Sequence, residues 1–349
     1  MNSSLLAIKQ AESPFFGGVD VGGTNIKIGL VDNRGRPIAK TSIVTHEERG
    51  PQDAVDRIGP VLQALMDQLQ LENGQVAAVG LGTPGPIDVS SGTVLTPGNL
   101  PHWRHFPIRD RLSDITGKKV AYANDANAAA FGEYWVGSGK NYHSMVLLTL
   151  GTGIGGGIII GDLLIEGENG LGAECGHMLI DISENSRQCS CGLDGHLEAY
   201  ASAHSIVRRT EEALTMGRSS SISARLESGE PLSTLMLYQE ASQGDQLSLD
   251  LILETANYIG MGVVNLIHLL DPNAVILGGA INFGGPESKV GQQFIEHIRA
   301  EVSRRTFPML RERTLVDFAS LGGDAGYIGA AGMARKMTIE TSTINNDGG

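Results

Sequence analysis

One pattern occurs twice in this chain of 349 residues: an apolar strand, a glycine-rich turn and a second apolar strand. It reads GVDVGGTNIKIGLVD at 18–32 and LTLGTGIGGGIIIGD at 148–162. Each copy begins a segment the size of a domain, and a chain this long exceeds what a single hydrophobic core usually serves. We interpret the pattern as a duplicated architectural unit whose two copies place both glycine turns on one cleft.

The spacing of apolar residues predicts alternating strands and helices around both turns. In the first half, strands are expected at 15–20, 26–32, 37–44, 76–81 and 119–123, and helices at 52–71, at 108–116 and at 126–135. In the second half, strands are expected at 145–150, 158–161, 273–277 and 314–319, and helices at 247–270, 287–303 and 324–337. The Pro and Gly content of residues 85–107 predicts a loop. The Ser and Gly content of residues 217–245 predicts a mobile helical insertion.

Composition and charge narrow the classes of protein. The hydrophobic fraction of 41% and the charged fraction of 19% are typical of a globular chain. A net charge of −13 argues against a nucleic-acid partner, because duplex binding usually needs a basic face. No apolar run approaches the roughly 20 residues that span a bilayer, and no secretory leader is recognised, so no membrane partner is expected. Three cysteines cannot build a secreted-type disulfide framework, and we therefore expect a cytoplasmic protein.

The first glycine turn has the composition of a phosphate-binding loop. Glycines allow the backbone N–H groups to approach a phosphate, Asp20 can hold Mg²⁺, and Lys27 can neutralise charge. An ordinary hairpin turn is the alternative, but the second turn makes the nucleotide interpretation stronger. Neither turn is a Walker A motif. The candidate nucleotide-binding residues in the two turns are Asp20, Gly22, Gly23, Thr24, Asn25, Lys27, Gly151, Thr152 and Gly153.

The dipeptide Asn124-Asp125 lies between a predicted strand and a predicted helix. A carboxylate at that position projects toward the edge where open α/β sheets bind their ligands. There it could orient an alcohol and accept its proton during phosphoryl transfer. Asn and Asp are also preferred helix N-caps, and the dipeptide alone favours that interpretation.

A cluster of thiols and imidazoles predicts a metal site. His177, Cys189, Cys191 and His196 follow the spacing H-x11-C-x-C-x4-H. Two thiolates and two imidazoles suit tetrahedral Zn²⁺, and four protein ligands would make the site structural rather than catalytic. The alternative is a set of reduced core thiols that includes Cys175.

Seven segments resemble, in order, those of the ROK family (repressors, open reading frames and sugar kinases). They are the turn at 20–25, GTPGPID at 82–88, PGN at 97–99, NDANAAA at 124–130, GTGIGGG at 151–157, GAECGH at 172–177 and CSCGLDGHLEAYAS at 189–202. The resemblance implies the actin-like, hexokinase-like ATPase fold, with two ribonuclease H-like α/β domains around a cleft. It implies domains at 15–130 plus 325–338 and at 131–324, with disordered tails at 1–14 and 339–349.

The resemblance also implies roles for particular residues. Asp125 matches the family's catalytic base, and Gly278-Gly279 match a further ATP-binding segment. His177, Cys189 and Cys191 match zinc ligands, whereas His196 stands where the family usually has a third zinc-binding Cys. The positions that match the family's sugar-binding segments are Gly82, Asn99, Asn124, Asp125, Glu174, His177 and Glu198.

Within the family the chain most resembles bacterial glucokinases, which implies phosphorylation of glucose by ATP with Mg²⁺ and a structural Zn²⁺. N-acetylmannosamine, N-acetylglucosamine, fructose and allose remain alternative sugars, and polyphosphate remains an alternative donor. A sugar-sensing repressor is a second class, but only 14 residues precede the first strand, too few for a winged helix domain. A non-catalytic sugar-binding protein is a third. A homodimer or homotetramer is expected from the resemblance alone.

Overall fold

The computed structural model describes residues 5–347, with side chains up to residue 341, as two compact units. Unit 1 comprises residues 1–142, 157–173 and 320–349, and unit 2 comprises 143–156 and 174–319. The expected boundary at residue 130 therefore differs from the observed one. Helix α3 (Asp125–Trp135) is continuous across that position and packs along α11 (Ala325–Asp347), so both helices belong to unit 1.

Unit 1 is built on a five-stranded sheet with the order β3-β2-β1-β4-β7. Strands β1 (Phe15–Val21), β2 (Asn25–Val31) and β3 (Pro37–Val44) form an antiparallel meander. Strands β4 (Val76–Thr83) and β7 (Val120–Asn124) continue the sheet in parallel with β1. The predicted loop at 85–107 also contains a small hairpin, β5 (Ile87–Asp88) and β6 (Thr93–Val94).

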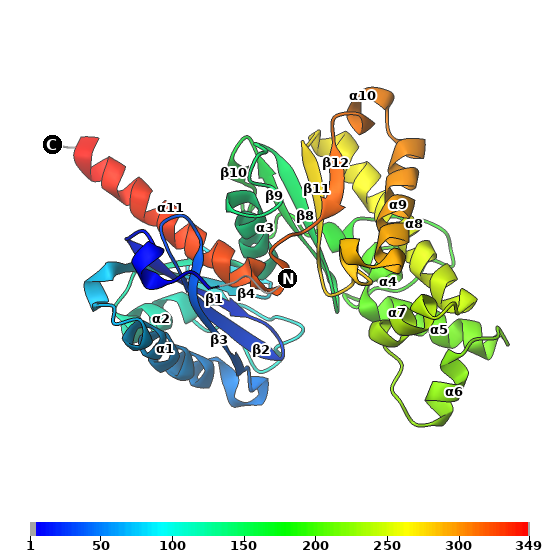
Figure 1. The fold of residues 1–349 in the computed structure, drawn as a ribbon, viewed down its shortest axis with the longest axis horizontal. Helices are drawn as coiled ribbons and strands as arrows, with labels where there is room; N and C mark the ends of the chain where they lie inside the picture. Colours follow the sequence, from blue (N-terminus) through cyan, green and yellow to red (C-terminus); the bar gives the residue numbers. More distant parts are fainter. Residues whose placement is uncertain (1–4, 348–349) are drawn as a thin grey trace. The chain divides into compact units, whose positions relative to one another are not determined.

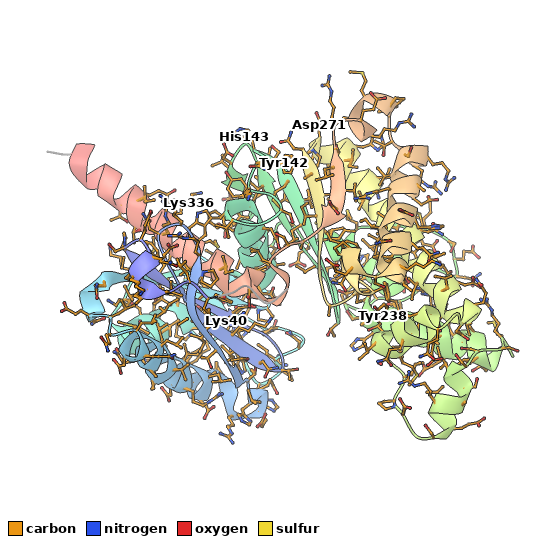
Figure 2. All side chains as sticks on the ribbon, viewed as in Figure 1. Lys40, Tyr142, His143, Tyr238, Asp271 and Lys336 are labelled. Atoms are coloured by element: carbon orange, nitrogen blue, oxygen red, sulfur yellow. The ribbon has the colours of Figure 1, made fainter. Side chains whose placement is uncertain are left out.

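Helices cover both faces of this sheet (Figure 1). On one face, α1 (Gly50–Gln68) and α2 (Ile108–Thr116) bury their apolar stripes in the larger core, because α1 repeats apolar residues at helical spacing. On the other face, α11 packs on β1 and β4, with Tyr327 and Ile328 in a second core. The side chain of Lys40, labelled on β3 in Figure 2, contacts Asp324 at 2.7 Å and so holds the start of α11.

Part of the expected tails is ordered. Residues 8–10 form a 3₁₀ helix, Leu6 N–H donates to Pro37 O at 2.8 Å, and Leu6 and Ile8 pack against the core. The expectation of a disordered segment is therefore wrong for residues 5–14, because their apolar side chains have a core to join. At the other end, α11 continues to Asp347, past the expected helix end. Residues 1–4 and 348–349 lie outside the described part of the chain.

The second sheet has the order β10-β9-β8-β11-β12, and its strands β8, β11 and β12 lie in unit 2. Its strands are β8 (Met145–Leu150), β9 (Ile154–Ile160), β10 (Leu163–Leu164), β11 (Ala274–Gly279) and β12 (Leu315–Phe318). Each sheet follows the chain order third, second, first, fourth, fifth, which supports the interpretation of a repeated unit. The glycine turn is shorter than expected, because Gly155, Gly156 and Gly157 belong to β9.

The helices of unit 2 follow the segment 177–196, which carries the predicted metal ligands, and several of them pack against α8 (Gln246–Leu270) (Figure 1). They are α4 (Glu198–Ala201), α5 (Ala203–Thr215), α6 (Ile222–Glu227), α7 (Thr234–Ser242), α9 (Lys289–Arg305) and α10 (Pro308–Arg311). By length and composition, α8 alone among the described helices could cross a membrane. Most of its apolar window is buried against neighbouring helices, as in the core helix of a globular unit.

Candidate functional site

The predicted residues of unit 1 meet at the carboxyl ends of three neighbouring strands. Asp20 on β1 pairs with Gly82 on β4, and Thr83 pairs with Asn124 on β7. A Cβ at Gly82 would lie 3.5 Å from the Cα of Asp125, which places that glycine directly beside the proposed base. The structure thus brings together at one edge residues that are about 100 positions apart in the sequence.

Of the pair Asn124-Asp125, the structure identifies Asn124 as a helix cap. Asn124 is the N-cap of α3, and its Oδ1 accepts the N–H groups of Ala126 (2.9 Å) and Asn127 (3.4 Å). Asp125 is the first residue of the helix, is half-buried, and its Oδ1 accepts the N–H of Ala126 at 2.8 Å. Burial raises the pKa of Tyr122, the hydrogen bond between its hydroxyl and Thr83 Oγ1 (2.8 Å) lowers it, and the charge of Asp125 raises it further. Both side chains therefore accept a hydrogen bond in the first turn of α3, and Asn124 is its N-cap.

The first glycine turn is exposed at Gly23, Thr24 and Asn25. Gly22 N–H donates to Asn25 O at 2.9 Å and closes the turn. Beside it, burial raises the pKa of Asp20 to about 6, while the charge of Lys27 lowers it. The Lys27 ammonium donates to Gly323 O at 2.6 Å and so anchors the approach to α11, a structural role that the sequence did not reveal.

Asn99 lies next to this turn. A Cβ at Gly23 would be 3.6 Å from the Asn99 Nδ2, and Asn99 itself is exposed. Its neighbours Leu100 and Trp103 are fully buried and fix the loop on the core. Unit 1 therefore places a predicted sugar-binding amide beside the predicted nucleotide turn.

The second glycine turn, in unit 2, contacts a carboxylate. Glu198 is the first residue of α4, and its Oε2 accepts the N–H of Ile154 at 2.8 Å. Any Cβ at Gly153 would lie 2.4 Å from that oxygen, so only glycine leaves room for it. Gly279 adopts a positive φ of 94° and pairs with Leu150, which places Gly278 and Gly279 beside the same turn.

The four predicted metal ligands form one cluster in unit 2, and all their ligand atoms lie within 4.8 Å of one another. The Nδ1 atoms of His177 and His196 are 3.3 Å apart, Cys189 Sγ is 3.8 Å from His177 Nδ1, and Cys191 Sγ is 3.3 Å from His196 Nδ1. Bonds of about 2.0–2.1 Å to nitrogen and 2.3 Å to sulfur would separate tetrahedral ligands by roughly 3.3–3.8 Å. The donor set and its spacing therefore fit zinc.

Glu174 and Glu198 border this cluster. Partial burial raises the pKa of Glu174, the nearby His177 lowers it, and the charge of Glu198 raises it. Ser190 Oγ donates to Glu198 Oε1 at 2.5 Å, so Glu198 joins the metal-ligand segment to the second turn. Both histidines point Nδ1 into the cluster, which leaves Nε2 of His177 for another partner.

Three residues that the sequence analysis missed support these loops: Thr45, Glu47 and Ser190. Thr45 and Glu47 contact partners 23 and 55 positions away, and neither belongs to a recognisable motif. Ser190 lies between the two ligand cysteines, which was an available signal.

Comparison with known proteins identifies the family. The ROK family model matches residues 16–337, and the chain belongs to this family. The glucokinase of Thermotoga maritima is 36% identical over 91% of this chain and 96% of its own length. The xylose repressor of Caldicellulosiruptor bescii is 30% identical over 74% of this chain and 62% of its own length.

A solved structure shows the same fold. The ROK family glucokinase from Streptomyces griseus, in complex with glucose and AMPPNP, is 34% identical and has a TM-score of 0.77. The match covers 92% of this chain and 99% of that one. The predicted two-domain, hexokinase-like α/β fold is confirmed, as is the resemblance to ROK sugar kinases.

Proposed function

We propose that this ROK-family sugar kinase transfers the γ-phosphoryl group of ATP to D-glucose, with Asp125 as general base. The observation that carries the proposal is the position of Asp125, which is the half-buried first residue of α3, beside Gly82 and next to the N-cap Asn124. The similarity to glucokinases along nearly the whole chain supports the sugar and the donor.

The reaction breaks one bond and forms another. The primary hydroxyl of the sugar, O6 of glucose, attacks the γ-phosphorus, and its proton passes to the Asp125 carboxylate. The bond from the γ-phosphorus to the β,γ-bridging oxygen breaks, and ADP leaves with that electron pair. Asn99, Asn124, Glu174, His177 and Glu198, with the backbone at Gly82, are proposed to hold the sugar.

Both glycine turns and Gly278-Gly279 are proposed to bind the nucleotide through backbone N–H groups. Asp20 is the residue of unit 1 that would hold Mg²⁺, because its carboxylate lies at the base of the first turn. Mg²⁺ would supply charge neutralisation for the phosphates. Thr24 and Lys27 add a hydroxyl and a cation at the same turn.

A structural zinc is proposed at His177, Cys189, Cys191 and His196. It would fix the segment that carries Glu174 and Glu198, because these carboxylates border the ligands in sequence and in contact. When bound, zinc supplies rigidity rather than chemistry.

The test is release of ADP from Mg-ATP in a coupled assay with glucose, mannose, fructose, N-acetylglucosamine and N-acetylmannosamine. We expect the largest kcat/KM with glucose. A larger value with an acetylated sugar would move the specificity while retaining the kinase mechanism.

No turnover with any sugar, together with intact sugar binding, would contradict the kinase proposal. The xylose repressor among the relatives makes sugar sensing the alternative class. Turnover with polyphosphate in place of ATP would change the donor alone.

A further inference from the structure

The short segment at 44–49 contacts both ligand loops of unit 1. Thr45 donates two hydrogen bonds to the glycine turn, and Glu47 accepts hydrogen bonds from His102 in the loop that carries Asn99. We infer that Thr45 and Glu47 are positioning residues for phosphoryl transfer: Thr45 orients the nucleotide turn, and Glu47 orients the sugar loop. This inference rests on the proposed function.

Thr45 holds the glycine turn by donating hydrogen bonds to two carbonyl groups of the turn. Its Oγ1 donates to Gly22 O at 2.7 Å, and its N–H donates to Thr24 O at 2.9 Å. In a trans peptide the C=O and the following N–H point in opposite directions. With Gly22 O directed to Thr45, the N–H of the exposed Gly23 is directed away from Thr45. That is the orientation a phosphate-binding turn needs.

Thr45 is itself fixed on α1. The side chain is fully buried, and Arg57 Nη2 donates to Thr45 O at 2.6 Å. The same guanidinium donates to Val44 O at 2.7 Å and to Asp53 Oδ2 at 2.7 Å. Thr45, which we call the brace of the first turn, is therefore held by helix α1 of the core rather than by a second loop.

Glu47 holds the sugar loop from one side while the core holds it from below. Its Oε1 accepts the N–H of His102 at 2.5 Å, and Oε1 and Oε2 each lie 2.9 Å from His102 Nδ1. The Glu47 side chain is 18% exposed, although that of His102 is 61% exposed. Asn99 lies three positions before His102 in this loop and next to Gly23, so we expect its position to depend on both contacts.

The experiment compares Michaelis constants for the two substrates. Thr45→Val removes only the hydroxyl donor, and we expect KM for ATP to rise about tenfold with KM for glucose within about twofold. Glu47→Gln weakens the bonds to His102 and should raise KM for glucose by a similar factor, leaving KM for ATP unchanged. Thr45→Ser keeps the hydroxyl and should restore the wild-type KM for ATP.

The adjacent, more exposed Glu48 provides a matched control, and Glu48→Gln should change neither constant. The inference is overturned if both variants raise both constants in parallel, or if neither variant changes either. A loss of thermal stability in both variants, without a rise in KM for ATP in one and for glucose in the other, would also overturn it. That result would indicate a purely structural role.

Ligand binding separates this inference from the proposed function. The chain has two Trp residues, and Trp103 lies four positions from Asn99, so a Trp135→Phe background makes Trp103 emission a reporter of glucose binding. AMPPNP binding is measured by calorimetry. If the wild type has no turnover, the proposed function fails. The inference is then decided by whether Thr45→Val weakens only AMPPNP binding and Glu47→Gln weakens only glucose binding. If it turns over glucose without those changes, only the inference fails, and if it binds neither ligand, both fail.

Discussion

The two glycine turns have the same place in their sheets, and in each the first glycine carbonyl accepts a hydrogen bond, from Thr45 Oγ1 at Gly22 (2.7 Å) and from Ala203 N–H at Gly151 (2.9 Å), but the side chains that contact them differ. At the first turn, Thr45 donates to two carbonyl oxygens, which directs peptide N–H groups away from the brace. At the second, Glu198 accepts the N–H of Ile154 and places a carboxylate beside Gly153. A carboxylate repels phosphate, whereas free N–H donors attract it. We therefore expect the first turn to lie closer to the phosphates, and the Glu198 carboxylate to link the second turn to the segment that carries the predicted metal ligands.

Replacing Asp125 should have the largest effect, because it is the proposed general base. We expect Asp125→Asn to lower kcat by about 10³-fold, since a positioned general base typically contributes 10²–10⁴-fold. KM for glucose should change little, because Asn124 still caps α3. Initial rates of ADP release measure both constants.

Asp110 is a matched control, because it is also an acidic residue in the first turn of a helix of unit 1. Asp110→Asn should keep wild-type kcat. If Asp125→Asn also retained near-normal turnover, the assignment of the base to this residue would be wrong.

Metal removal should have the next largest effect and should distinguish the two units. Among the described residues, the candidate metal-binding group of His and Cys lies in unit 2. We expect one zinc per chain and a fall in Tm of about 5 °C or more after stripping with 1,10-phenanthroline, because metal binding contributes to folding. His196→Ala should lose zinc, and His196→Cys should keep it.

Cobalt substitution tests the role of His196 without relying on activity. The sulfur-to-cobalt absorption should correspond to two thiolates in the wild type and three in His196→Cys. Stoichiometric zinc in His196→Ala, with an unchanged Tm, would remove His196 from the ligand set.

Much of unit 1 could be predicted because its signals are local. The apolar pattern of β1 and β4 and the helical spacing of α1 are continuous in the sequence. The dipeptide Asn124-Asp125 predicted either a cap or a base, since both roles use the same side chains. Only the observed bonds of Asn124 to Ala126 and Asn127 identify Asn124 as the N-cap, and the base remains a proposal.

The braces could not be predicted, because their contacts are long-range and have no period. Glu47 accepts a hydrogen bond from His102, and Lys27 donates one to Gly323 O. In the sequence alone, Glu47 and Lys27 have the character of ordinary surface residues. Likewise, the glycines at 155–157 suggested a longer turn. These residues belong to strand β9, and close packing explains the glycine at position 157. A Cβ at Gly157 would lie 2.3 Å from that of Ala130.

A substitution at Gly153 tests the second brace directly. In Gly153→Ala the new methyl carbon would displace the Glu198 carboxylate from Ile154 N–H. We expect kcat/KM for glucose to fall about 10- to 100-fold, the range for losing a hydrogen bond to a charged group. In Gly151→Ala the nearest atom is Gly153 O at 4.0 Å, so this control should stay within about threefold. Equal losses in both variants would mean that the turn, not its contact with Glu198, is sensitive.

The smallest expected effect comes from Gly23→Ala, and it tests the first turn. Its Cβ would lie 3.6 Å from Asn99 atoms, an ordinary contact, so the unliganded protein should keep its Tm. If the backbone at Gly23 approaches a phosphate closely, the methyl group should raise KM for ATP about three- to fivefold and leave KM for glucose unchanged. An unchanged KM for ATP would mean that glycine at this position serves the fold alone. The contrast between the turns would then rest only on their braces, since neither glycine would distinguish a phosphate-binding turn from a structural one.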